Sequence, residues 1–235
     1  MQLVLDNLSK SYGKKMVLNN INYTFEKGKI YGLLGRNGAG KTTLFNIING
    51  NISSDNGNIY LNSDGHVQKL DDDIGYVIST PNVPLFLTAR EFLKFFIEVN
   101  ESKIENIKTI DEYFDMVNID VSHRDKLLKD YSHGMKNKIQ MLVNFILKPS
   151  ILLLDEPLTS LDVVASEEMK KIFLSIKDES ILIFSTHIME LALSLCDEII
   201  ILVNGKLECI HIDGKSDEDV KNMIIEHLKE DNYDK

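Results

Sequence analysis

The chain has 235 residues, which suits one large domain or a domain with an inserted lobe. Hydrophobic residues make up 43% of it and charged residues 26%, the proportions of a globular protein with a sizeable core. The net charge of −10 argues against a protein that binds nucleic acid, so no nucleic-acid partner is expected. Cys196 and Cys209 are too few for a disulfide framework, which indicates a reducing, cytoplasmic compartment.

No segment of the sequence predicts a membrane span. The longest apolar runs, residues 151–154 and 199–203, have the length of strands, whereas a spanning helix needs about 20 apolar residues. The first ten residues, MQLVLDNLSK, lack the basic and then apolar pattern of a signal peptide. If the protein acts at a membrane, another polypeptide must therefore hold it there.

The first 87 residues predict mainly β-structure with one helix. Apolar and polar residues roughly alternate over residues 16–25, which is the period of a half-buried strand. We expect a turn at residues 11–13, and Gly57 with its neighbouring Asn residues indicates a hairpin within residues 55–64. The predicted strands are residues 2–8, 16–25, 29–34 and 74–78, and the predicted helix is residues 42–49.

A helical block follows this β-rich part. Thr88 and Glu91 have the spacing of a capping box, which predicts a helix start, and Pro149 predicts the end of the last helix. Further helices are predicted at residues 111–117 and 133–147. We interpret residues 88–148 as a helical lobe inserted between strands.

The alternation of strands and helices then resumes. Residues 151–154 are all apolar, as in a strand that is buried on both faces of a parallel sheet, and Asn204–Gly205 is a strong hairpin signal. Residues 213–235 hold eight acidic residues against four lysines and predict a short helix at 219–229 with a frayed end. The other predicted strands are residues 181–184, 198–203 and 207–212, and the other predicted helices are residues 163–176 and 187–195.

The strongest functional motif is a glycine-rich loop between a predicted strand and a predicted helix. It matches the pattern GxxxxGK[ST] in full. Glycines let the backbone wrap a polyphosphate with its N–H groups pointing inward, and the helix N-terminus favours negative charge. Lys41 is expected to bridge the β- and γ-phosphates of ATP, Thr42 to ligate Mg²⁺, and Thr43 to help hold the α-phosphate. The loop residues are Gly35, Arg36, Asn37, Gly38, Ala39, Gly40, Lys41 and Thr42.

An acid pair follows the apolar run at residues 151–154. Ligands of open parallel sheets bind at the carboxyl ends of the strands, which is where Asp155 and Glu156 are expected. Asp155 suits a Mg²⁺ site, and Glu156 is placed to orient and deprotonate an attacking water. With the glycine-rich loop, this predicts an α/β P-loop NTPase whose core sheet is mostly parallel.

The segment Tyr131–Ser132–His133–Gly134–Met135 lies about twenty residues before the acid pair and resembles the LSGGQ signature of the ATP-binding cassette (ABC) ATPases. The order of loop, signature, acid strand and His187 is also that of this family, so the chain resembles an ABC ATPase subunit over almost its whole length. The resemblance implies an N-terminal antiparallel β subdomain. It also implies a nucleotide-binding core of residues 1–87 and 149–212, a helical signature subdomain of residues 88–148 and an acidic tail of residues 213–235.

In this family two ATPase domains pair head to tail, and each ATP lies between the loop of one and the signature of the other. The resemblance therefore implies that Ser132 and Gly134 contact the γ-phosphate in the partner's site, although a serine here is also an ordinary helix cap. His187 would contact the γ-phosphate and the attacking water. Tyr12 would stack on adenine, with a packed turn residue as the alternative. Residues Ser160, Leu161 and Asp162 resemble the D-loop that communicates across the dimer, and Asp162 also has the position of a helix cap.

The sequence departs from the family pattern at two places. Ser79 stands where the family usually has the Q-loop glutamine that links the site metal to the membrane subunit. Asn82, close by, is a possible substitute. His133, Gly134 and Met135 replace Gly-Gly-Gln in the signature, so that His133 adds a side chain near the phosphate.

The resemblance implies an ATPase subunit that drives transport through separate transmembrane permease subunits, in the manner of bacterial export systems. It would lie on the inner face of the membrane, with the apolar residues of PLFLTAREFLKFF (84–96) as candidates for the permease contact. One alternative is a non-transport ABC ATPase of translation, repair or metallocluster assembly. Another is a GTPase-type switch, but the guanine-reading Asn-Lys-x-Asp motif is missing because Ile139 and Gln140 follow Asn137–Lys138.

Overall fold

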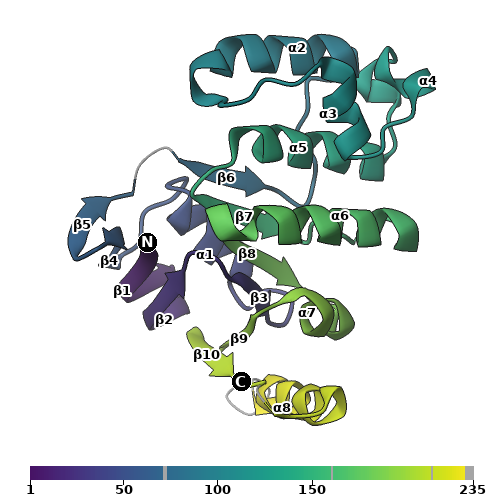
Figure 1. Ribbon diagram of the computed structural model, residues 1–235. Helices are drawn as coiled ribbons and strands as arrows, with labels where there is room; N and C mark the ends of the chain where they lie inside the picture. The colour runs from purple at the N-terminus through teal and green to yellow at the C-terminus, as the bar shows by residue number, and fades with distance from the viewer. Residues whose placement is uncertain (71–72, 160, 213, 231–235) are drawn as a thin grey trace.

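The computed structural model describes residues 1–70, 73–159, 161–212 and 214–230. Two sheets and the helices around them form the α/β fold that the sequence predicts (Figure 1). The first sheet is antiparallel, with strand order β2-β1-β4-β5, and the second is mostly parallel, with order β10-β9-β3-β8-β7-β6. Within the described ranges, no helix combines the length and the apolar character that crossing a membrane requires.

The antiparallel sheet confirms a β-rich start but corrects two predicted turns. Ser11 and Tyr12 are paired strand residues, so the first turn lies at Gly13 and Lys14. Residues 56–63 form one strand, and the hairpin turn follows at Asp64–Gly65, because these two residues supply the consecutive positive φ angles, 53° and 83°, of a tight turn. The strands are β1 (Gln2–Tyr12), β2 (Lys15–Glu26), β4 (Asn56–Ser63) and β5 (His66–Lys69).

The second sheet carries the motifs at the carboxyl ends of its strands. The neighbouring strands β9, β3, β8, β7 and β6 run parallel. Strand β10 pairs antiparallel with β9 across the predicted Asn204–Gly205 turn. Every residue of β3, β7 and β8 is buried, as their continuous apolar runs predict. The strands are β3 (Ile30–Leu34), β6 (Ile74–Val77), β7 (Ile151–Asp155), β8 (Ile181–Thr186), β9 (Glu198–Val203) and β10 (Lys206–Ile210).

The two faces of this sheet bury different partners. Leu153 on β7 packs in one cluster with Phe45 of α1 (Lys41–Ile48) and with β1 and β2, so α1 lies between the two sheets. Leu152 and Leu154 point the other way, into a cluster with Phe173 of α6 (Val163–Ile176) and with α5 (His133–Leu147). Because successive side chains of β7 point to opposite faces, the phosphate-loop helix α1 packs on one face of this strand and the signature helix α5 on the other.

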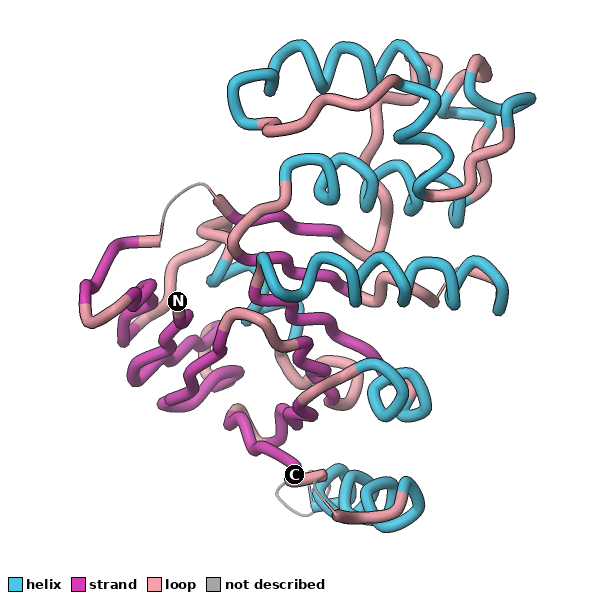
Figure 2. The backbone as a smooth tube through the Cα atoms, viewed as in Figure 1, coloured by secondary structure: helices cyan, strands magenta, loops and turns pink. Residues whose placement is uncertain are grey.

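The predicted helical block consists of α2 (Ala89–Asn100), α3 (Ile110–Met116), α4 (Val121–Arg124) and α5, and α2 to α4 lie beyond α5 as seen from the sheets (Figure 2). The Thr88–Glu91 capping box is present at α2. Arg124, only 5% exposed, is held by Asp111, Asp115 and the carbonyl of Ile119. The short 3₁₀ turns are Glu101–Lys103, Leu128–Asp130 and Lys177–Glu179.

The last two helices line one edge of the molecule. α7 (Met189–Leu195) starts two residues later than predicted, and α8 (Asp217–Glu230) starts two residues earlier. Val220 and Ile224 of α8 are buried against β9 and β10. The part of the predicted acidic tail that forms α8 is therefore packed on this edge of the second sheet. Helices α7 and α8 lie beside each other in Figure 1.

One close approach in this core is open to a direct test. A methyl group on Gly32 of β3 would lie 2.5 Å from Sγ of Cys196, which follows α7. We expect Gly32→Ala to lower the free energy of unfolding by about 1–3 kcal/mol, because the added carbon overpacks a tight contact. Gly32→Ala/Cys196→Ala should recover part of that loss in urea unfolding, since the clashing sulfur is gone. Strictly additive losses would contradict this packing.

Candidate functional site

The glycine-rich loop joins β3 to α1 at the carboxyl edge of the parallel sheet. Gly38 and Gly40 have φ angles of 80° and 113°, which residues with side chains rarely adopt. A Cβ on Gly40 would also lie 2.8 Å from Cγ1 of Val17, so glycine is needed here for space as well. The backbone conformation therefore explains why the motif has glycine at these two positions.

Lys41 lies inside the curve of this loop. Its ammonium donates to the carbonyls of Gly35 (2.7 Å) and Arg36 (3.3 Å), and only 8% of the residue is exposed. Burial lowers the pKa of Lys41, while the carboxylates of Glu156 and Asp155 oppose that shift. The cation is thus held by the loop and faces the acid pair.

Asp155 ties three elements together at the end of β7. Its Oδ1 accepts a hydrogen bond from Oγ of Ser185 on β8 (2.5 Å), and its Oδ2 accepts one from Oγ1 of Thr42 on α1 (3.0 Å). The residue is 5% exposed. A carboxylate and a hydroxyl within hydrogen-bond distance of each other offer hard oxygen ligands of the kind that Mg²⁺ prefers, so these residues fit such an ion.

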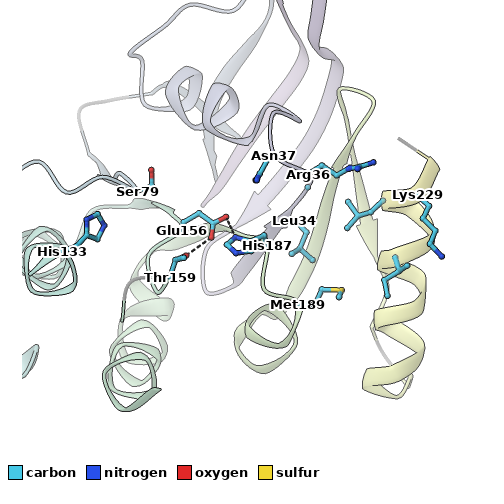
Figure 3. A pocket seen from close by; sticks show the side chains of 13 residues that line it. Leu34, Arg36, Asn37, Ser79, His133, Glu156, Thr159, His187, Met189 and Lys229 are labelled. Carbon is cyan, nitrogen blue, oxygen red and sulfur yellow. Dashed lines mark hydrogen bonds and ion pairs between the residues drawn. The ribbon is translucent and has the colours of Figure 1, made fainter. Parts of the chain in front are cut away.

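Glu156 leaves the strand with a left-handed backbone, φ 53°. Its N–H donates to the carbonyl and the hydroxyl of Ser185, both at 3.2 Å, which stabilises this uncommon conformation. Its carboxylate accepts from Oγ1 of Thr159 (3.0 Å) and contacts Nδ1 of His187 (2.9 Å) (Figure 3). The Glu156 carboxylate is therefore oriented by two side-chain contacts.

These side chains border two adjoining clefts. The smaller, about 450 Å³, is lined by the phosphate loop, Asp155, Glu156, Ser79 and Tyr12. Tyr12 is 52% exposed, and the Lys10 ammonium lies 5.7 Å from its ring centre. The larger cleft, about 940 Å³, lies between the loop, His187 and α8 (Figure 3). The predicted loop, acid, Ser79, His187 and Tyr12 residues therefore line two clefts that share part of their lining.

The signature residues are placed at the start of α5. Ser132 caps this helix, since its hydroxyl accepts from the N–H of Met135 (3.2 Å). His133 borders the larger cleft with Ser79 and Glu156, and Gly134 is half-buried. Ser132 itself is exposed, so that the cap and its free helix end face outward.

The D-loop prediction lies partly outside the described residues, because Ser160 is not among them. Leu161 packs against the core that α5 and α6 share. The Asp162 carboxylate accepts from the N–H of Ala165 (2.9 Å), so its predicted role as the cap of α6 is confirmed. The role of this segment across a dimer stays a prediction.

The contacts of several residues around the site were not predicted. Ser185 is the first of two polar residues that end β8 after four apolar ones, a signal that could have indicated its contact with the acid pair. Thr159 had no such signal. Ile225, Leu228 and Lys229 of α8 border the larger cleft, and their place depends on how the tail folds back rather than on any local motif.

A family model described as ABC transporter matches residues 18–159. The chain belongs to the ABC transporter family. This membership makes it an ATP-binding and ATP-hydrolysing subunit, as the loop and the acid pair predict. It supports the transport function over translation, repair or metallocluster assembly.

Similar proteins cover most of the chain. It is 35% identical over 230 residues to an uncharacterized ABC transporter ATP-binding protein of Methanocaldococcus jannaschii, covering 97% of this chain and 83% of that protein. It is 33% identical over 206 residues to the lantibiotic transport ATP-binding protein SrtF of Streptococcus pyogenes, covering 87% and 88% of the two chains.

Solved structures share the fold. An ATP-binding subunit of an ABC transporter matches with a TM-score of 0.80 at 24% identity, over 96% of this chain and 100% of the other. A dimeric ATP-binding cassette in a post-hydrolysis state, bound to ADP and phosphate, matches with a TM-score of 0.74 at 24% identity, over 91% and 100%. At this identity, the likeness supports the fold alone.

Ser185 offers a test of how the acid pair is held. We expect Ser185→Ala to lower the free energy of unfolding by about 1–3 kcal/mol, because the buried Asp155 carboxylate loses a donor and the Glu156 N–H loses one acceptor. Ser175→Ala is the matched control, since its hydroxyl makes only an exposed bond to its own helix. Equal unfolding midpoints in urea for the two variants would contradict the assignment.

Proposed function

We propose that this chain hydrolyses ATP in the smaller cleft and that two such subunits use the cycle to drive a transmembrane permease. The observation that carries the proposal is the Glu156 carboxylate, held between His187 and Thr159 beside the phosphate loop. Two contacts orient this carboxylate, which supports the role of a base for the attacking water. The neighbouring Lys41 supplies positive charge for the phosphates.

The proposed roles follow the position of each residue. Lys41 and the backbone of the loop hold the β- and γ-phosphates, and Thr43 contributes at the α-phosphate. Tyr12, which also lines the smaller cleft, stacks on adenine. Glu156 orients the water and takes its proton, and His187 positions that carboxylate and contacts the γ-phosphate.

Thr42 and Asp155 would hold Mg²⁺ with the phosphates. Their oxygens are 3.0 Å apart, and Ser185 fixes the orientation of the carboxylate. When bound, Mg²⁺ supplies charge that offsets the negative phosphate oxygens. The residues of this chain hold the phosphate loop, the acid pair and α1 in fixed positions relative to one another.

A second ATPase subunit, identical or related, would complete the site. Ser132 and His133 are exposed at the free N-terminal end of α5, whose N–H groups favour an anion. In the proposed dimer this end meets the γ-phosphate held by the partner's loop. Hydrolysis removes that contact, so the two subunits separate.

The helical part, residues 88–148 with the segment before it, would contact the permease at the cytoplasmic face of the membrane. Of the apolar residues in 84–96, Ala89 and Leu93 are buried, whereas Leu85, Phe86 and Phe95 are 50%, 79% and 59% exposed. Backbone bonds from Leu128 to Leu87 and from Lys129 to Leu85 hold this segment in place. Exposed aromatic residues on a fixed backbone are typical of a protein interface.

The catalytic proposal is tested by ATP hydrolysis at saturating MgATP. We expect Glu156→Gln to lower kcat by about 100-fold or more, because general-base catalysis contributes roughly that much, while ATP still binds. Glu179→Gln is the control, since Glu179 lies on the surface in an ion pair with Lys148. A Glu156→Gln variant with the wild-type rate would overturn the role of this residue.

The permease contact is tested in membranes of the source cells. We expect Phe86→Asp/Phe95→Asp to shift the chain from the membrane pellet to the supernatant, since a charge in an apolar contact is unfavourable. The unfolding midpoint and the basal ATPase rate should stay at wild-type values. Val67→Asp on β5, also exposed, serves as the control. Unchanged membrane retention of the double variant would argue against this surface.

A further inference from the structure

The segment that carries Ser79 is held by a side chain that no motif contains. Gln140 lies on α5, two turns after His133 at the start of the helix, and is only 7% exposed. Its Oε1 accepts from the N–H of Asn82 (2.9 Å), and its Nε2 donates to the carbonyl of Ile78 (3.1 Å). One amide therefore clamps both ends of the short loop between these residues.

The hydrogen bonds of Gln140 begin where the pairing between β6 and β7 ends. The ladder between β6 and β7 ends at Val77, paired with Leu154, so the carbonyl of Ile78 is the next group along the chain. A glutamine amide offers one donor side and one acceptor side, as a peptide group does. Gln140 thus replaces a strand neighbour for the segment and links it to α5 instead of to the sheet.

The loop that Gln140 holds lies beside the nucleotide clefts, so its position affects the proposed ATPase site. Ser79, inside the clamped loop, borders both clefts with Glu156. His133 at the first turn of α5 lies on the same side of the cleft as Ser79 (Figure 3). A buried amide with its donor and its acceptor both bonded orients its partners strongly, because breaking either bond leaves a buried polar group unpaired.

A second amide on the same helix contacts the other half of the site. Asn137, one turn before Gln140, donates from Nδ2 to the carbonyl of Pro157 (2.9 Å), immediately after Glu156. Residues three apart lie on the same face of a helix. The face of α5 that turns toward the sheet therefore bonds to the Ser79 segment and to the acid-pair segment.

We propose that Gln140 is a positioning residue that fixes the Ser79 loop to the signature helix, so that the nucleotide cleft and the signature end of α5 move together. Ser79 has a short side chain, and the backbone on either side of it is attached to α5 through Gln140. The link between cleft and helical part then runs through this amide. This role rests on the proposed ATPase function of the same site.

The test compares kcat and KM for ATP in wild-type protein, Ser79→Ala, Gln140→Met and the double variant. Gln140→Met keeps the volume and removes both bonds. We expect kcat to fall roughly 10- to 100-fold with KM changed less than about threefold, since misplacement of a supporting group affects the rate more than the binding. Because both substitutions act through one loop, the double variant should lose no more than the larger single loss.

Two controls separate positioning from stability. Met141→Ala, at the next and fully buried position, should lower the unfolding midpoint and leave kcat unchanged. Gln140→Leu also removes both bonds, and it should lower kcat in the same direction, so the role can be tested even if the Met variant does not fold.

The outcomes are distinguishable. An unchanged kcat in a folded Gln140 variant, or losses in the double variant that multiply, would overturn the role of Gln140 while the ATPase function stands. A wild-type chain that does not hydrolyse ATP would overturn the proposed function and this role with it. A falling kcat, a steady KM and non-multiplying losses would establish the clamp.

Discussion

The hydrogen-bonded carboxylate of Asp155 is the contact on which the rest of the site depends. It accepts from Ser185 on β8 and from Thr42 on α1, and it continues a strand whose every residue is buried. A buried carboxylate is stable only with such donors, so the strand, its neighbour and the phosphate loop must come together in one arrangement. Glu156 then turns out of the strand with a positive φ, which aims its side chain at His187 and Thr159.

The signature helix α5 extends this arrangement to the helical part of the chain. It packs on the face of β7 opposite to α1, so one strand separates the phosphate-loop helix from the signature helix. Gln140 and Asn137 bond from this helix to the backbone beside Ser79 and after Glu156. A movement of α5 would therefore shift the backbone beside Ser79 together with the backbone after Glu156, which is what the proposed coupling between hydrolysis and a permease requires.

Much of this was predictable from the sequence, because the signals are local. The apolar run at 151–154, the glycine loop and the Thr88–Glu91 capping box each reflect one element, and each is present. The positions of Gln140, Thr159 and the α8 residues were not predictable, since they depend on contacts between segments far apart in the chain. The two misplaced turns are located by strand pairing rather than by composition: Tyr12 pairs with Lys15 and Ser63 with His66, so each turn lies at the two residues between them.

The central claim is that one chain supplies the loop and the acid pair while a second supplies the signature. It is tested most directly by the molar mass of Glu156→Gln in solution, measured by size-exclusion chromatography with light scattering, with ATP and with ADP. The account predicts a dimer with ATP, a monomer with ADP, and a monomer with ATP when Gly134→Asp is added to that variant. A Glu156→Gln chain that binds ATP to saturation and stays monomeric, or a dimer that Gly134→Asp leaves intact, would contradict it.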